Sequence, residues 1–128
     1  YWGSLPLFAG LAARGPAFLA EVQAGRAANS APGLACSLRG MGAGAMEPVW
    51  EGLDQVRFPC TFIAGGLDHA YVELGLRLAA TVPGSRVEVV PGAGHSVQQE
   101  QPDAFARLLA GHLAAARAAV SSSSSTAE

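Results

Sequence analysis

Two short apolar segments, residues 60–64 and 86–90, each run into a glycine-containing turn that ends in a reactive side chain. The first turn ends at Asp68, and the second, residues 91–94, leads directly to His95. Residues 60–64 show no alternation of polar and apolar side chains, which is typical of a strand covered on both faces. The first segment therefore predicts a buried strand and the second segment predicts another strand. An acid follows the carboxyl end of the first, and an imidazole follows that of the second.

Apolar residues at helical spacing follow each predicted strand, across residues 72–82 and 104–120. Strand, helix, strand and helix joined by short connections predict an α/β fold with a parallel sheet. Two strands alone leave open edges and much uncovered apolar surface, and the chain begins at Tyr1 without a methionine. We therefore expect a C-terminal fragment of a larger α/β domain.

The first part of the chain is rich in Ala, Leu and Gly. Its apolar spacing predicts helices around residues 18–22 and 34–41, and a further short helix over residues 50–56. Ser30 followed by Pro32 suits the beginning of the second helix, because Ser caps a helix and Pro fits the first turn.

Residues 40–45 match the G-x-G-x-x-A pattern of dinucleotide-binding turns. That pattern requires a preceding strand and an acidic residue at the end of a second strand about twenty residues later. Here it follows a helical pattern instead. We interpret the segment as a link between two helices, so no nucleotide cofactor is predicted.

Composition excludes several classes of partner. A net charge of −2 gives no electrostatic attraction to nucleic acid or to a membrane surface, and charged residues or glycines interrupt every apolar run. Cys36 and Cys60 are too few for a disulfide framework and are typical of a reducing compartment. His69 and His112 have no partners at metal-ligand spacing. No metal is predicted; we expect His112 to be solvated and His69 to lie next to the site of Asp68.

Asp68 and His95 are the candidate catalytic residues. The carboxyl ends of parallel strands meet at one edge of a sheet, where α/β proteins bind ligands. A carboxylate there fixes the tautomer of the imidazole, whose other nitrogen faces a nucleophile or substrate as general base. The usual third member of such a relay, a serine in a G-x-S-x-G turn, does not occur in the sequence.

Arg14, Arg26 and Arg39 lie in the helical first third of the chain. Surface solvation is the ordinary role of arginine. If these helices cover the strand ends, however, a guanidinium is suited to hold a carboxylate substrate in two parallel hydrogen bonds.

Residues 58–68, then residues 91–95 with Glu100 and Pro102, resemble the C-terminal third of the α/β-hydrolase superfamily over residues 50–118. The segments W-x-x-L-P-L-F from Trp2 and L-A-x-x-L-R-x-x-G-x-G from Leu34 resemble the MenH family, the 2-succinyl-6-hydroxy-2,4-cyclohexadiene-1-carboxylate synthases of menaquinone and phylloquinone biosynthesis.

This resemblance implies a lyase without a cofactor, in which a Ser-His-Asp relay removes a proton from a carboxylate substrate and pyruvate leaves. At the matching positions Asp68 orients His95, and His95 is the base partner. Trp2, Arg26 and Arg39 bind the substrate. The serine and the oxyanion donors lie upstream of this chain.

The resemblance also divides the chain into a helical cap over residues 1–49, the C-terminal part of the hydrolase core over residues 50–118, and a disordered Ser-rich tail over residues 119–128. In plants and algae this activity is the last module of a fused plastid protein. The resemblance therefore implies a chloroplast location and a fusion to upstream modules of the same pathway. A cytoplasmic location is the alternative. Two alternatives remain: a generic hydrolase of esters or carbon–carbon bonds, and an inactive fragment.

Overall fold

The structure of the protein is a computed structural model that describes residues 8–124. Its sheet consists of two parallel strands, β1 (Thr61–Gly65) and β2 (Arg86–Val90). Thr61 lies opposite Arg86 and Gly65 lies opposite Val90, so both strands end at the same level. The predicted parallel α/β arrangement is confirmed, and β1 is displaced by one residue from the prediction.

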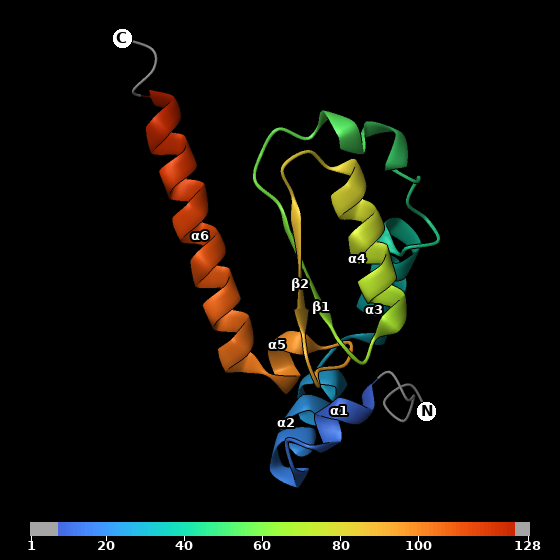
Figure 1. Ribbon diagram of the computed structural model, residues 1–128. Helices are drawn as coiled ribbons and strands as arrows, with labels where there is room; N and C mark the ends of the chain where they lie inside the picture. Colours follow the sequence, from blue (N-terminus) through green and yellow to red (C-terminus); the bar gives the residue numbers. More distant parts are fainter. Residues whose placement is uncertain (1–7, 125–128) are drawn as a thin grey trace.

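Two long helices cover the sheet. Helix α4 (His69–Thr81) packs against both strands on one side, and α6 (Pro102–Ser124) lies on the other side (Figure 1). The short helix α5 (Val97–Glu100) connects the end of β2 to α6. Covering both faces accounts for the continuous apolar character of β1.

The core lies at the carboxyl ends of the strands, between the sheet, α5 and α6. Val90, Ala93 and Val97 are buried there. Partly buried apolar side chains from β1 and α6 pack against them: Ile63, Ala104, Phe105 and Leu108. The turn that leads to His95 thus contains a core residue, Ala93.

The helices of the first part are α1 (Ala9–Ala12), α2 (Pro16–Ala27), α3 (Ala31–Met41) and the 3-10 helix η3 (Trp50–Gln55). The predicted cap of α3 is confirmed, since Ser30 Oγ accepts a hydrogen bond of 3.1 Å from the Gly33 amide. Helices α1 and α2 lie beyond the carboxyl ends of the strands, where α1 contacts α5 (Figure 1). Helices α1 and α2 therefore face the edge at which the candidate residues gather.

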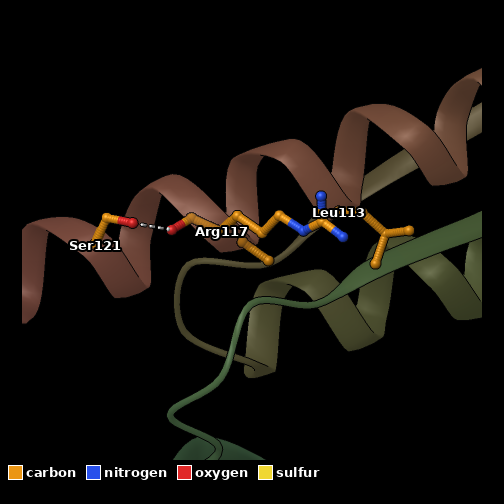
Figure 2. Close-up of a pocket in the computed structure, with 4 residues that line it drawn as sticks. Leu113, Arg117 and Ser121 are labelled. Carbon is orange, nitrogen blue, oxygen red and sulfur yellow. Dashed lines mark hydrogen bonds between the residues drawn. The ribbon is translucent and has the colours of Figure 1, made fainter.

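Helix α6 extends further than predicted. Residues 121–124 were expected in a disordered tail, but the helix continues to Ser124. The Ser121 hydroxyl donates to the Arg117 carbonyl one turn earlier, at 3.0 Å (Figure 2), so the polar side chain bonds to the helix backbone. Residues 125–128 lie outside the described residues. A hollow of about 480 Å³ lies along this part of α6, lined by Leu113, Ala116, Arg117 and Ser121 (Figure 2).

The prediction that His112 is solvated is wrong. His112 is half-buried, and its Nδ1 forms a hydrogen bond of 2.9 Å with the hydroxyl of Thr61. This bond joins the middle of α6 to the first residue of β1. A helical pattern reveals which residues share a face, but it does not reveal which strand residue meets them.

Candidate active site

Asp68 is held by the start of α4. After β1 the chain turns within three residues, and the Asp68 amide donates to the Gly65 carbonyl at 3.0 Å. Asp68 is the N-cap of α4, where its Oδ1 accepts from the Tyr71 amide at 3.3 Å. Capping satisfies an amide that the first helical turn leaves unpaired. Because one carboxylate oxygen serves the helix, the side chain is fixed and Oδ2 is directed elsewhere.

His95 follows a tight turn after β2. Gly92 has a φ of 73°, a left-handed conformation that costs glycine little and other residues more. The Ala93 amide then donates to the Val90 carbonyl at 3.3 Å. The chain thereby reverses over residues 91–94 and delivers His95 to the edge of the sheet where β1 also ends.

Backbone hydrogen bonds join the two turns. The Gly66 amide donates to the Val90 carbonyl at 2.8 Å, and the Leu67 amide donates to the Ala93 carbonyl at 2.9 Å. A Cβ on Gly65 would overlap the carbonyl oxygens of Ala93 and Gly94. Glycine at position 65 is therefore what allows the turns to approach closely enough for their side chains to meet.

Asp68 and His95 form a direct pair. His95 Nδ1 donates to Asp68 Oδ2 at 2.7 Å. The Asp68 side chain is only 6 % exposed, whereas the His95 side chain is 29 % exposed. Occupation of Nδ1 selects one tautomer and leaves Nε2 as the nitrogen available to exchange a proton. The pair can therefore act as an oriented general base, provided that a nucleophile or substrate meets Nε2.

Aromatic rings frame the imidazole. Tyr71 lies edge-on to His95 with ring centroids 4.7 Å apart, and Phe8 does so at 6.1 Å. Arg26 on α2 places its guanidinium carbon 5.6 Å from the centroid of the Phe8 ring. The sequence prediction missed both aromatic residues. For Tyr71 a signal existed, because it lies one helical turn after Asp68 and so shares its side of α4.

The structure does not bring all predicted site residues together. Arg26 contacts the Phe8 ring, and the Phe8 ring contacts His95. Arg39 is exposed on α3, and its guanidinium lies 3.8 Å from Cys36 Sγ on the same helix. Within residues 8–124 Arg39 has no hydrogen bond or ion pair with the Asp68–His95 pair. Trp2 lies outside the described residues.

Within residues 8–124, the side chains of two further candidates make no hydrogen bond or ion pair with Asp68 or His95. Arg14 stacks over the Phe18 ring at 5.0 Å, and His69 is exposed at the beginning of α4.

The described part of the chain contains no group of three or more His, Cys, Asp or Glu side chains placed to hold a metal ion. Over the same residues, none of the helices has the length and apolar character needed to cross a bilayer.

A first prediction concerns the close approach of the turns. Gly65→Ala is expected to destabilise the protein by about 1–3 kcal/mol, because the new methyl group meets fixed backbone carbonyls rather than movable side chains. Urea unfolding followed by circular dichroism measures the change. Gly25→Ala on α2 is the matched control: a Cβ there meets nothing within 4 Å, so it should leave stability unchanged or raise it by up to about 1 kcal/mol. Equal effects of the two substitutions would contradict the prediction.

Known proteins resemble this chain in sequence and in fold. Residues 1–108 match the model of the alpha/beta hydrolase family. The chain is 33 % identical over 109 residues to the putative 2-succinyl-6-hydroxy-2,4-cyclohexadiene-1-carboxylate synthase of Bacillus subtilis, an alignment that covers 85 % of this chain and 40 % of that protein. The structure of MenH from S. aureus superposes with a TM-score of 0.84 and 26 % identity, covering 91 % of this chain and 44 % of MenH.

The chain thus spans less than half the length of both relatives. The similarity to MenH that the sequence predicts is confirmed, as is the α/β-hydrolase fold. The family match extends from the first helices through both strands and into α6. The chain therefore belongs to the alpha/beta hydrolase family.

Proposed function

We propose that these residues are the C-terminal part of a MenH-type lyase. The complete protein eliminates pyruvate from 2-succinyl-5-enolpyruvyl-6-hydroxy-3-cyclohexene-1-carboxylate, a reaction of menaquinone biosynthesis. The observation that carries this proposal is the 2.7 Å pair of Asp68 and His95 at the shared strand ends, in a chain similar to a curated synthase of this kind. A serine in the part of the protein outside these 128 residues completes the relay.

We assign a role to each member of the relay. Asp68 holds His95 in the tautomer whose Nε2 accepts a proton, and His95 activates the serine. The relay then takes a proton from the substrate carbon, and the electron pair of that C–H bond forms a double bond. The C–O bond between the ring and the enolpyruvyl oxygen breaks, and its electron pair stays on that oxygen. The enolate released in this way takes up a proton at its methylene carbon and becomes pyruvate. General base catalysis of this kind requires the base within hydrogen-bond reach of the proton it removes.

The substrate carries carboxylates, and the first helices offer the groups that bind them. The guanidinium of Arg26 lies over the ring of Phe8, and that ring in turn lies against His95. One aromatic ring therefore links Arg26 of α2 to the imidazole. A guanidinium there can bind a carboxylate in two parallel hydrogen bonds. We assign Arg39 and Trp2 to the same substrate-binding role, and residues 1–49 to a cap over the site.

A generic hydrolase is the second candidate. The Asp68–His95 pair supports ester or carbon–carbon bond hydrolysis equally well, because the pair orients a base and does not select a substrate. In both cases the 128-residue chain alone is expected to be inactive, since relay catalysis depends on the missing nucleophile.

The test uses a protein that joins these residues to their upstream part with the G-x-S-x-G turn. Pyruvate release from the succinyl-enolpyruvyl substrate is measured beside cleavage of a p-nitrophenyl ester by the same preparation. Saturable pyruvate release with weak ester cleavage is the expected result. Ester cleavage without pyruvate release would contradict the lyase proposal and support the hydrolase. Turnover by the 128-residue chain alone would refute the requirement for an upstream serine.

A further inference from the structure

We propose that Glu100 is a positioning residue for His95. Its two carboxylate oxygens bind the backbone on both sides of the imidazole: Oε2 accepts from the Gly94 amide at 2.7 Å, and Oε1 accepts from the Ser96 amide at 3.1 Å. These amides belong to the residues immediately before and after His95. The inference rests on the proposed function for its catalytic meaning, but the geometry that it describes is independent of any substrate.

Bridging both neighbours restricts the backbone of His95 itself. With Gly94 and Ser96 tied to one rigid group, the torsions of His95 between them have little freedom, and the direction of its Cα–Cβ bond is fixed. Hydrogen bonds to a carboxylate are stronger than those between neutral groups. Among residues 8–124 no cation pairs with Glu100, so its oxygens serve these two amides.

Glu100 is itself well anchored. It is the last residue of α5, whose first residue, Val97, is buried in the core cluster. The next side chain, Gln101, donates from Nε2 to the Pro91 carbonyl at 2.8 Å. The turn before His95 is therefore held at its beginning by Gln101 and at its end by Glu100. Both residues stand at the junction of α5 and α6, so the helices determine where the imidazole lies.

The same carboxylate also lies against α1. A Cβ built on Gly10 of α1 would overlap Oε2 of Glu100, and the nearest atoms around it all belong to that carboxylate. A flexible side chain could ordinarily move aside, but Glu100 can do so only by giving up its bonds to the His95 turn. Phe8, two residues before Gly10, contacts the His95 ring. A change in the position of α1 should therefore move the Glu100 carboxylate and, with it, change the orientation of His95.

A simpler role must be distinguished from this one. Ser96 is the N-cap of α5, and a glutamate that bonds back to the N-cap amide resembles a capping box. If Glu100 only capped α5, its loss would loosen the helix without changing the tautomer of the imidazole. The bond to Gly94, on the other side of His95, has no part in capping.

The experiment compares Glu100→Ala and Glu100→Gln with Glu73→Ala, a control at an exposed glutamate of α4. In protein labelled with ¹⁵N-histidine, long-range ¹H–¹⁵N spectra report the tautomer of each ring, and His95→Gln identifies the His95 signals. The wild type should show a single tautomer with a proton on Nδ1 and a downfield resonance for the bond to Asp68. Glu100→Ala should lose that resonance and average the two ring nitrogens. Glu100→Gln keeps one acceptor oxygen, so its His95 signals should lie between those of the wild type and those of Glu100→Ala. The His95 signals of Glu73→Ala should match the wild type.

Amide exchange gives the second measurement. Exchange at Gly94 and Ser96 should become at least about tenfold faster in Glu100→Ala, as expected for loss of bonds to a charged acceptor. Gly10→Ala should shift the His95 signals in the same direction, although alanine normally favours a helix. An unchanged His95 tautomer in Glu100→Ala, with faster amide exchange, would reduce Glu100 to a helix cap and overturn the proposal. Global unfolding of both Glu100 variants, with Glu73→Ala folded, would overturn it as well. Neither outcome depends on turnover, so neither would be confused with failure of the proposed function.

Discussion

His95→Ala should abolish pyruvate release by the complete protein, lowering kcat by about 10⁶-fold, the scale found when the relay histidine of a serine protease is removed. The structure supplies the reason. His95 is held by Asp68 at 2.7 Å with Nε2 left for proton transfer, and the imidazole provides both the acceptor and its orientation. Alanine removes both at once, while the partly exposed position tolerates the smaller side chain.

The measurement is the steady-state rate of pyruvate release at saturating substrate. His112→Gln is the matched control, because it removes an imidazole from α6 but keeps a group that can bond to Thr61. A conservative change away from the carboxyl ends of the strands should leave kcat within about twofold of the wild type. Retention of more than about one hundredth of the wild-type rate by His95→Ala would show that a different base carries the reaction.

The features that the sequence predicted correctly are those that depend on topology. Both strands and their parallel pairing followed from the order of apolar runs and helical spacing, since a short β-α-β connection has few alternatives. The meeting of Asp68 with His95 followed from the same topology. The carboxyl ends of paired parallel strands lie at one edge, and only a few turn residues separate each side chain from its strand.

The features that it missed depend on contacts between distant parts of the chain. Phe8 reaches His95 only because α1 packs on α5, and no periodicity encodes that packing. The bond between His112 and Thr61 likewise depends on where α6 crosses the sheet. Glu100 was recognised as part of a motif, but its role became visible only when its two oxygens were found on Gly94 and Ser96.

The lengths of helices were predicted less well than their presence. Helix α4 begins three residues before the predicted boundary, because Asp68 caps it directly. Helix α6 continues through residues 121–124 although serine is a modest helix former. In both cases a side-chain hydrogen bond to the helix backbone accompanies the extension, and propensity alone does not anticipate such bonds.

Asp68→Asn should lower kcat by about 10⁴-fold while leaving the fold intact. Asparagine has the same shape and is an equally good N-cap, so its side-chain oxygen can still accept from the Tyr71 amide that Asp68 Oδ1 now binds. The amide nitrogen, however, would then face His95 Nδ1. Two donors cannot share one bond, and the imidazole would adopt the tautomer with its proton on Nε2, which cannot accept a proton from the serine.

Asp68→Ala separates this effect from stability. Alanine removes the cap of α4 as well as the partner of His95, so it should cost about 1 kcal/mol of stability that Asp68→Asn retains. Unfolding midpoints and kcat are measured for both variants, and the His95 ring signals report the tautomer directly. A large loss of turnover in Asp68→Asn with a wild-type midpoint is the expected combination. Wild-type turnover in Asp68→Asn would mean that the short bond between the two side chains stabilises the turns without orienting a base.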